Sequence, residues 1–266
     1  MDSDGHDKNG DGIISEGERF TNLMEYELDF ILGNSTDPTN PDSDNDGMPD
    51  GWEIFYNLNP ISSLDSNKDL DEDGYDWNRD SSISPDERFT NLEEYNAGTN
   101  PWNPDTDDDT MTDGWEVYYG LDPRSNGDAW FDSDVDGWDS NFDMELSFDE
   151  RYLNYMEFLN DTHPFDEDTD GDDMPDGWEV YFGLDPLRAS DNFEDKELDG
   201  LPNIYEYNNS LVQGWNDADG IFTTRPDLND TDYDGISDND EMLYHKTDPT
   251  FNDTDRDGMP DGWEVL

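Results

Sequence analysis

Hydrophobic residues in this chain form short clusters, and long polar stretches rich in Asp, Asn and Gly separate one cluster from the next. Typical clusters are residues 115–119, which Gly120 follows directly, and residues 89–95, which Gly98 follows after two residues. A few apolar residues at helical spacing, bounded by Gly, predict helices of about two turns. Because so short a helix is marginal in water, we expect its stability to come from contacts at its ends and from aromatic packing against the neighbouring unit.

The clusters recur at a fixed interval. Asp-Gly-Trp-Glu occurs around Trp52, Trp115, Trp178 and Trp263, with steps of 63, 63 and 85 residues, and Leu-x-Pro and Thr-x-Pro turns keep the 63-residue step. An additional loop and helix at about residues 230–252 account for the longer last step. We therefore predict four repeats, at residues 1–64, 65–127, 128–190 and 191–266, arranged as an array in which each unit contacts only its neighbours.

Charge changes this picture, because the chain carries 74 Asp and Glu against 12 Lys and Arg, a formal net charge of -62. Self-repulsion on this scale leaves either a disordered chain or one that folds around cations. Nine Trp, thirteen Tyr and thirteen Phe at repeated places favour the folded alternative. The charge also excludes nucleic acid and insertion into an anionic membrane, and the absence of Cys excludes disulfides, so metal must hold the fold together.

One Asp-rich stretch has the spacing of a twelve-residue calcium loop. Its positions 1, 3, 5, 6, 7, 9 and 12 are Asp42, Asp44, Asp46, Gly47, Met48, Asp50 and Glu53. Ca²⁺ takes about six to eight oxygens, the Gly permits a sharp turn, position 7 offers its backbone carbonyl and Glu at position 12 contributes two oxygens.

The same spacing predicts ten further loops, which gives about eleven Ca²⁺ sites. Three keep the Gly, with ligands at Asp7, Asn9, Asp11, Ile13, Ser15 and Glu18; at Asp230, Asp232, Asp234, Ile236, Asp238 and Glu241; and at Asp253, Asp255, Asp257, Met259, Asp261 and Glu264. Four replace the Gly, with ligands at Asp105, Asp107, Asp109, Met111, Asp113 and Glu116; at Asp168, Asp170, Asp172, Met174, Asp176 and Glu179; at Asp76, Asn78, Asp80, Ser82, Ser84 and Glu87; and at Asp139, Asn141, Asp143, Glu145, Ser147 and Glu150. The last three are Asp195, Glu197, Asp199, Leu201, Asn203 and Glu206; Asp69, Asp71, Asp73 and Tyr75 closed by Asp80; and Asp132, Asp134, Asp136 and Trp138 closed by Asp143.

Some of these loops are expected to be less regular than others. Where the Gly is missing, another residue must take positive φ, which costs energy. Asp80 and Asp143 each belong to two overlapping loops and would bridge two ions. Eleven ions would add 22 positive charges and change the formal charge from -62 to -40.

The remaining chemistry indicates no active site. The carboxylates have the spacing of calcium-loop ligands, and the three His are scattered along the chain. The sequence contains no nucleophile elbow, phosphate loop or dinucleotide fingerprint, so we expect no enzymatic activity. Each Trp that precedes a position-12 Glu is interpreted as a cover for its calcium loop, with a carbohydrate-binding platform as the alternative. Sequons predict N-glycosylation at Asn34, Asn160, Asn208, Asn229 and Asn252.

Asp-x-Asp-x-Asp-Gly-type loops in overlapping tandem, such as residues 168–179 and 253–264, resemble thrombospondin type 3 repeats of the microbial kind. The resemblance implies calcium-stabilised rods with little regular secondary structure in secreted and cell-surface proteins. The chain lacks the cysteines of animal members, so no disulfide carries over. Loops followed by a helix also resemble dockerin modules, whose paired EF-hand-like loops bind a partner domain.

We therefore predict a mostly irregular fold with short α-helices, in which tandem calcium-loop/helix repeats form an elongated, solenoid-like, metal-stabilised rod. The expected function is that of an extracellular or cell-surface structural protein that forms a filament. The stalk of a large adhesin and a dockerin-like protein-binding module are the alternatives. The expected partners are Ca²⁺, further copies or a longer parent chain, and surface glycans or a protein receptor.

The ends of the sequence carry a related expectation. Asp2, Asp4, Gly5 and Asp11 fit positions 3, 5, 6 and 12 of a loop whose first ligand would precede Met1, and Leu266 follows Glu264 by two residues. We expect either that the sequence continues in a longer repetitive chain or that subunits join end to end and complete each other's terminal sites.

Overall fold

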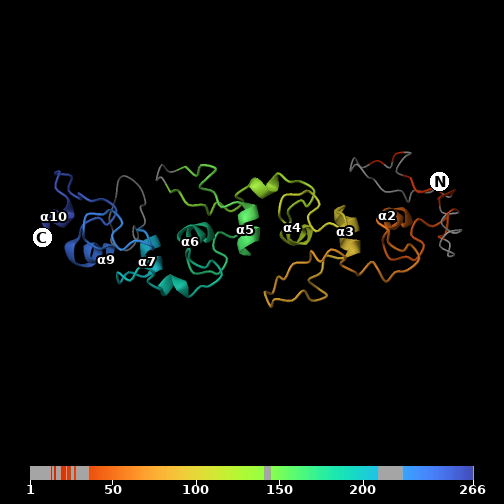
Figure 1. The fold of residues 1–266 in the computed structure, drawn as a ribbon, viewed down its shortest axis with the longest axis horizontal. Coiled ribbons are helices and arrows are strands. Elements are labelled where there is room, and N and C mark those ends of the chain that lie inside the picture. Colours follow the sequence, from red (N-terminus) through yellow and green to blue (C-terminus); the bar gives the residue numbers. More distant parts are fainter. Residues whose placement is uncertain are drawn as a thin grey trace. The chain divides into compact units, whose positions relative to one another are not determined.

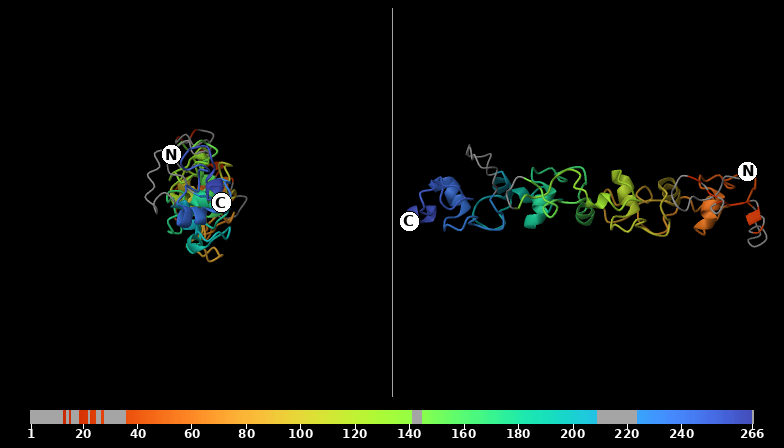
Figure 2. Two further views of the ribbon diagram at one scale, coloured as in Figure 1. Left: turned by 90° about the vertical axis from the view of Figure 1, so that its left-hand side faces the viewer. Right: turned by 90° about the horizontal axis from the view of Figure 1, so that it is seen from above.

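The structure is a computed structural model that describes residues 13, 15, 19–21, 23, 24, 27, 36–140, 145–208 and 224–265. The chain divides into two compact units, Met1–Trp130 and Phe131–Leu266. In each unit the described residues form short helices joined by irregular loops, and no β-strand occurs among them (Figure 1). The same alternation of helix and loop is visible in the right-hand view of Figure 2. The prediction of a mostly irregular fold with short helices is confirmed.

In the described part of the first unit, the helices with defined bounds are α2 (Asp50–Phe55), α3 (Asn91–Ala97), α4 (Asp113–Tyr119) and the 3₁₀ turn η1 (Asp128–Trp130). Those of the second unit are α5 (Asn154–Asn160), α6 (Asp176–Phe182), the 3₁₀ turn η2 (Asp191–Phe193), α7 (Asn203–Tyr207), α9 (Asp238–Asp240), the π-helical turn η3 (Glu241–His245) and α10 (Asp261–Glu264). Among the described residues, no helix has the length and apolar character needed to cross a bilayer.

Local sequence fixes where these helices begin and end. Gly98, Gly120 and Gly183 end α3, α4 and α6 in the left-handed conformation, with φ of 80°, 82° and 69°. The α3 helix begins at Asn91 rather than at residue 89, because the Glu93 carboxylate accepts hydrogen bonds from both the amide and the hydroxyl of Thr90, at 2.7 Å each.

The apolar core is confined to a few side chains in each repeat. Met174, Trp178 and Phe182 form a buried cluster in the second unit, and Tyr207 of α7 packs edge-on against Trp178 with ring centroids 5.2 Å apart. In the first unit Trp52 packs in the same way against Tyr95 of α3, at 5.4 Å. Trp52, Trp115 and Trp178 are at most 2% exposed, whereas Trp263 is 67% exposed. Burial of the first three indoles against aromatic rings fits a structural role and leaves them no face for a sugar.

Successive loops contact each other through the Gly of Asp-Gly-Trp-Glu. The Gly114 amide donates a hydrogen bond to Asp73 Oδ2 of the preceding loop at 3.2 Å, and the Gly177 amide donates to Asp136 Oδ2 at 2.8 Å. A Cβ atom on Gly114 would overlap the Asp73 carbonyl oxygen. Gly is therefore required here because the helix terminus touches the backbone of the preceding loop, as also occurs between Gly262 and Asp234.

The predicted repeat boundary at 127/128 lies three residues before the boundary between the two units at 130/131. The repeat boundaries at 64/65, 127/128 and 190/191 all stay predictions.

Candidate calcium sites

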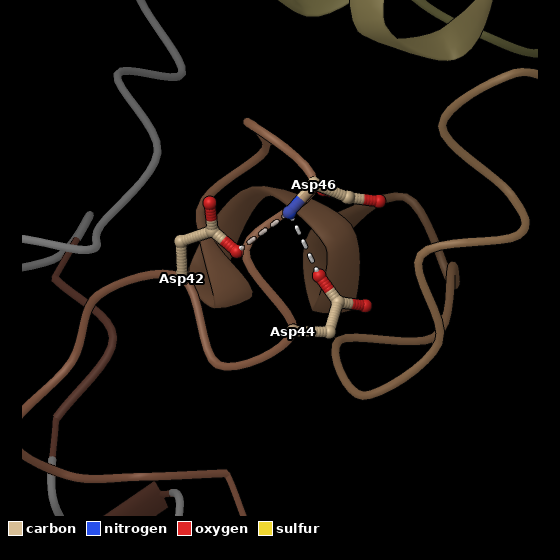
Figure 3. A group of neighbouring side chains, drawn as sticks. All are labelled: Asp42, Asp44 and Asp46. Carbon is tan, nitrogen blue, oxygen red and sulfur yellow. Dashed lines mark hydrogen bonds between the residues drawn. The ribbon is translucent and has the colours of Figure 1, made fainter.

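The loop that precedes α2 brings three aspartates together. Carboxylate oxygens of Asp42, Asp44 and Asp46 lie within 4.8 Å of one another. Figure 3 shows how the backbone holds them, since the Asp46 amide donates to Asp42 Oδ1 and to Asp44 Oδ1, at 3.2 Å each. The amides of Asn45 and Gly47 also donate to Asp42, at 2.7 and 3.0 Å. The loop therefore curls around its first carboxylate as the calcium spacing predicts.

A second group of carboxylates extends this site. Oxygens of Asp46, Glu53 and Asp65 also lie within 4.8 Å of one another, and Glu53 is fully buried in the first turn of α2. Both oxygens of Glu53 and one oxygen each of Asp44, Asp46 and Asp65 have no hydrogen-bond partner in the described part of the chain. Desolvating unpaired carboxylates costs several kcal/mol per ion, so in its ionised form this arrangement is stable only with a cation among these oxygens.

The loops at residues 105–116 and 168–179 repeat this arrangement. Glu116 and Glu179 are fully buried in α4 and α6, and within the described chain neither has a hydrogen-bond partner for its carboxylate oxygens. Both carboxylate oxygens of Asp107 and both of Asp170 are also buried without a hydrogen-bond partner in the described chain. The side chains at position 7, Met48, Met111 and Met174, are fully buried, and their carbonyls stay predicted ligands.

Position 9 makes a different contact from the predicted one. Both Asp50 oxygens accept hydrogen bonds from position 2 of the same loop, from the Ser43 amide at 2.8 Å and the Ser43 hydroxyl at 2.7 Å. The equivalent pairs are Asp113 with Thr106, Asp176 with Thr169, Asp238 with Thr231 and Asp261 with Thr254. These carboxylates tie the start of the loop to the helix, and their role as ligands stays a prediction.

The loop that begins at Asp69 is closed by α3. Asp73, Glu94 and Asp113 oxygens lie within 4.8 Å of one another, and both Asp71 oxygens and one oxygen each of Asp73, Asn91 and Glu94 are buried without a hydrogen-bond partner among the described residues. The prediction that Asp80 closes this loop is wrong. Asp80 is exposed, and its carboxylate accepts a hydrogen bond from the Ser82 amide of its own loop at 3.0 Å. A shared Asp80 bridging two ions is therefore not found.

This site is an interrupted calcium loop. Asn91 and Glu94 take the places that Asn203 and Glu206 hold in the uninterrupted loop at residues 195–206, where both Glu206 oxygens are buried and without a hydrogen-bond partner in the part described. The residues between Tyr75 and Asn91 are thus an insertion between positions 7 and 9. The loop beginning at Asp132 is built alike, with Asn154 and Glu157 of α5 in these places; Asp143, its predicted closing residue, lies outside the described residues.

The Thr-x-Pro turns gain a role from this geometry. The hydroxyl of Thr99 donates to Glu94 Oε2, and the hydroxyl of Thr162 donates to Glu157 Oε2. Each Thr thereby holds one carboxylate oxygen and leaves Oε1 of the same Glu directed to the site, without a hydrogen-bond partner in the described chain.

In the two inserted loops, residues 76–87 and 139–150, the closing Glu accepts hydrogen bonds from residues of its own loop. Glu87 accepts hydrogen bonds from Asn78 Nδ2 at 2.6 Å and from the Ser84 amide at 2.8 Å. Glu150 accepts from Ser140 and Ser147 in the same way. Ca²⁺ binding by these loops stays a prediction, and Asn141 lies outside the described residues.

The remaining predicted loops differ in how complete they are. At residues 230–241, one oxygen each of Asp230, Asp232 and Glu241 is buried without a hydrogen-bond partner in the described chain. At residues 253–264 the aspartates curl as in the first loop, but Glu264 is exposed. The loop at residues 7–18 lies outside the described residues except for Ile13 and Ser15.

Loops without Gly at position 6 do adopt the strained backbone that was expected. Gly47 has φ of 101°, and at the same position Thr110 has φ of 97° and Asp173 of 73°. A β-branched residue such as Thr110 pays for this conformation, which is common only for Gly.

We predict that Thr110→Gly stabilises the calcium-loaded protein by about 1 kcal/mol, because it removes this strain. Chemical denaturation in saturating Ca²⁺ measures the change. Thr112→Gly is the matched control, since Thr112 has extended backbone with φ of -87° and gains nothing from Gly. Equal effects of both substitutions would contradict the strain argument.

Burial and mutual repulsion raise the pKa values of the clustered carboxyls. Desolvation, with the charge of Asp46 adding to it, raises the pKa of Glu53 to about 10. The same two causes raise the pKa of Glu206 to about 10, with Glu197 as the neighbour, and that of Asp73 to about 9, with Asp71 as the neighbour. Without a cation these groups are therefore neutral in the folded state at pH 7.

These pKa values predict a pH dependence that reverses when calcium is present. A carboxyl whose folded pKa lies above its unfolded value near 4.5 stabilises the fold fully below that value and loses the effect as pH rises toward 9–10. In a chelator, the helical circular dichroism signal should therefore be larger at pH 5 than at pH 8. In millimolar Ca²⁺ the order should invert, because protons then compete with the ion. The same order in both buffers would contradict this account.

The donor set identifies the kind of cation. The described clusters offer carboxylate, amide and carbonyl oxygens, with neither Cys nor His among them. Hard oxygen donors suit Ca²⁺ and Mg²⁺, but Mg²⁺ keeps several waters and demands a small octahedron, whereas each of these sites gathers several carboxylates. The residues present therefore fit Ca²⁺.

Comparison with known proteins agrees with this chemistry. Residues 42–61 and 230–250 match the bacterial TSP3 repeat family. The chain thus carries cysteine-free repeats of the bacterial TSP3 type, and TSP3 repeats imply calcium binding. The comparisons with curated proteins and with solved structures found no match.

Two kinds of candidate ligand were missed by the sequence analysis: Asp65 and Asp191 beyond the loops, and the pairs Asn91 with Glu94 and Asn154 with Glu157. A signal existed for the pairs, because Asn-x-x-Glu also ends the loop at residues 195–206. For Asp65 and Asp191 the signal was the repeat itself, because Asp65, Asp128 and Asp191 follow one another at steps of 63 residues. In a chain with so many Asp residues, that regularity alone does not distinguish a ligand.

Proposed function

We propose that this chain is an extracellular calcium-binding structural protein that builds a filament at or beyond the cell surface. The observation that supports the proposal is the series of buried carboxylates without hydrogen-bond partners in the described chain, including Glu53, Glu116, Glu179 and Glu206, each in a loop with very little apolar packing. Ions then replace the apolar core of an ordinary domain. The carboxylates are committed to holding cations, so we propose no catalytic role.

An extracellular location follows from the affinity expected of such sites. Calcium modules that work outside the cell have Kd values of about 10⁻⁴–10⁻³ M. Sites of this strength fill only at millimolar Ca²⁺, so the fold depends on the external concentration. We further propose that the repeats form an elongated rod, since each loop contacts the next through one helix terminus, as Gly114 contacts Asp73.

Filament formation is the finer part of this proposal. The contact between a helix terminus and the preceding loop is heterologous, because it joins two different surfaces, and a repeated heterologous contact that does not close generates a filament. Terminal loops of two copies, or of one longer chain, can repeat the contact that Gly177 makes with Asp136.

The experiment is imaging and light scattering of the full chain in chelator and in about 10 mM Ca²⁺, a concentration at least about tenfold above the expected Kd. Filaments that form with Ca²⁺ and dissolve with chelator support the proposal. A calcium-loaded protein that stays monomeric at all concentrations removes the filament and leaves the adhesin stalk. Stoichiometric capture of one protein domain from the same source would instead favour a dockerin-like module.

Glycosylation belongs to the same proposal. Of the five sequons, Asn34 lies outside the described residues, and Asn160 Nδ2 donates a hydrogen bond to the Met156 carbonyl of α5 at 2.9 Å. That atom would have to carry the glycan, so Asn160 is the least suited of the described sequons. Intact mass before and after glycosidase treatment of native material tests this.

A further inference from the structure

Asp65 lies outside every calcium loop predicted from the sequence, in the irregular segment between α2 and α3. Its side chain is 5% exposed, and it shares the cluster of Asp46 and Glu53, whose oxygens lie within 4.8 Å of one another. Its Oδ2 accepts a hydrogen bond from the Asn59 amide at 2.9 Å. Its Oδ1 is buried and has no hydrogen-bond partner in the described chain.

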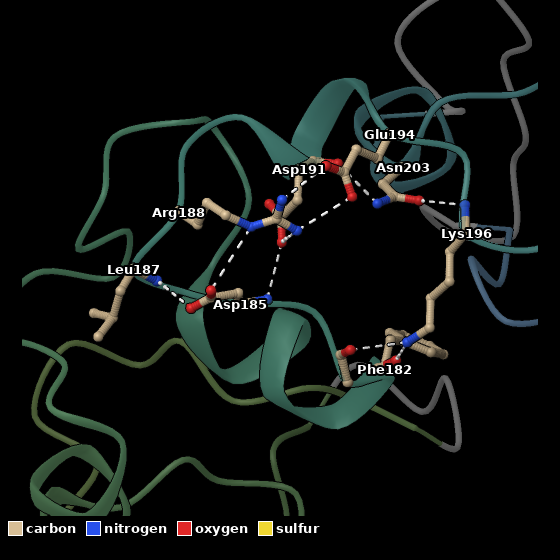
Figure 4. A network of polar contacts seen from close by, with 9 residues as sticks. Phe182, Asp185, Leu187, Arg188, Asp191, Glu194, Lys196 and Asn203 are labelled. Atoms are coloured by element: carbon tan, nitrogen blue, oxygen red, sulfur yellow. Dashed lines mark hydrogen bonds and ion pairs between the residues drawn. The ribbon is translucent and has the colours of Figure 1, made fainter.

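The same two environments of the carboxylate oxygens, one bound by a backbone amide and one buried without a partner in the described chain, occur 126 residues later at Asp191, which Figure 4 shows. Asp191 is 1% exposed, and its Oδ2 accepts a hydrogen bond from the Asp185 amide at 2.9 Å and lies 3.5 Å from Arg188 Nη2. Its Oδ1 is again buried, with no hydrogen-bond partner among the described residues. The charge of Asp191 acts on Glu179 and Asp172 of the loop before it, where it helps to raise their pKa values.

We propose that Asp65 and Asp191 are calcium ligands from outside the twelve-residue loop, which bind the ions held by the loops at residues 42–53 and 168–179. In each case one carboxylate oxygen is fixed by a backbone amide and the other is left for the ion. Without an ion, a third carboxylate placed beside Glu53 and Asp46 would only add desolvation and repulsion. This assignment rests on the proposed calcium function and specifies how the ion is held.

The added ligand links one site to the next. Asn91 Nδ2, at the start of α3, donates to the Asp65 carbonyl at 2.8 Å, and Asn203 Nδ2, at the start of α7, donates to the Asp191 carbonyl at 2.9 Å. Asn91 and Asn203 belong to the following sites, with Glu94 and Glu206. The segment around Asp65 therefore serves two sites: its carboxylate lies with Asp46 and Glu53, and its carbonyl holds Asn91 of the next site.

The test is the number of ions bound by the full chain, counted by equilibrium dialysis at the lowest Ca²⁺ concentration that saturates the unmodified protein. The variants are Asp65→Asn, Glu53→Gln and the two combined. Asn keeps an oxygen for the Asn59 amide while replacing the oxygen that faces the ion. Each single variant and the double variant should lose the same one ion, with affinity for it at least about tenfold lower. Asp191→Asn with Glu179→Gln repeats the test in the second unit and serves if Asp65→Asn fails to fold.

The control is Asp122→Asn, which removes the same charge from an exposed turn residue and should leave the count unchanged. A double variant that loses two ions would overturn the assignment, because Asp65 and Glu53 would then hold different ions. A full count in Asp65→Asn with lower stability would also overturn it, because Asp65 would then serve only the Asn59 turn. If the unmodified protein binds no Ca²⁺, the proposed function fails, whatever Asp65 does.

Discussion

Removal of Ca²⁺ should unfold this protein at neutral pH, with loss of most of the helical circular dichroism signal and exposure of Trp52, Trp115 and Trp178. At ten times Kd, each bound ion stabilises the folded state by about 1.4 kcal/mol. Seven such ions give about 10 kcal/mol, which equals the whole stability of an ordinary domain. The helices have three to seven residues and the apolar core is small, so little else holds the fold.

The measurement is far-ultraviolet circular dichroism and Trp fluorescence during a Ca²⁺ titration from chelator, with thermal melts at each concentration. The melting temperature should rise with the logarithm of free Ca²⁺. Mg²⁺ at equal ionic strength is the control for general screening and should restore much less structure. Spectra that are the same with and without chelator would show that the carboxylate clusters do not need an ion.

A second large effect is expected from Gly114→Ala, which should destabilise the calcium-loaded protein by about 2–3 kcal/mol. In an open helix Ala is better than Gly by about 1 kcal/mol, so the ordinary expectation has the opposite sign. Here a Cβ atom would overlap the Asp73 carbonyl oxygen and lie 3.0 Å from Phe89 Cβ. Backbone cannot rotate away as a side chain can, so overpacking and loss of the hydrogen bond to Asp73 outweigh the helix preference.

Gly127→Ala provides the matched control, because its Cβ atom would meet only Ser125 Oγ at 3.8 Å. Its stability should stay within about 0.5 kcal/mol of the unmodified protein. Denaturant unfolding in saturating Ca²⁺ compares the two variants. A neutral or stabilising Gly114→Ala would show that α4 does not sit on the loop of Asp73.

The local chemistry of the loops was determined by the sequence alone. Asp42, Asp44 and Asp46 curl around one point because alternate residues place short carboxylates on the same side of a tight loop, and Gly47 permits the positive φ. Gly98 and Gly120 likewise end α3 and α4 where the sequence predicted. These features depend on contacts within about twelve residues, so spacing is enough to predict them.

Only the tertiary structure decided which carboxylates share a site. Glu94 of α3, rather than Asp80, closes the loop that begins at Asp69. Inserted residues separate the start of this loop from α3 in the sequence, but the backbone brings the two parts together. Asp65 joins Glu53 across a segment with no regular structure, and both carboxylate oxygens of Asp50 accept hydrogen bonds from Ser43. The physical reason is that one carboxylate is chemically equivalent to another. In a chain with 74 Asp and Glu residues, the residue type shows which side chains can bind an ion. Only the path of the backbone determines which carboxylates lie together.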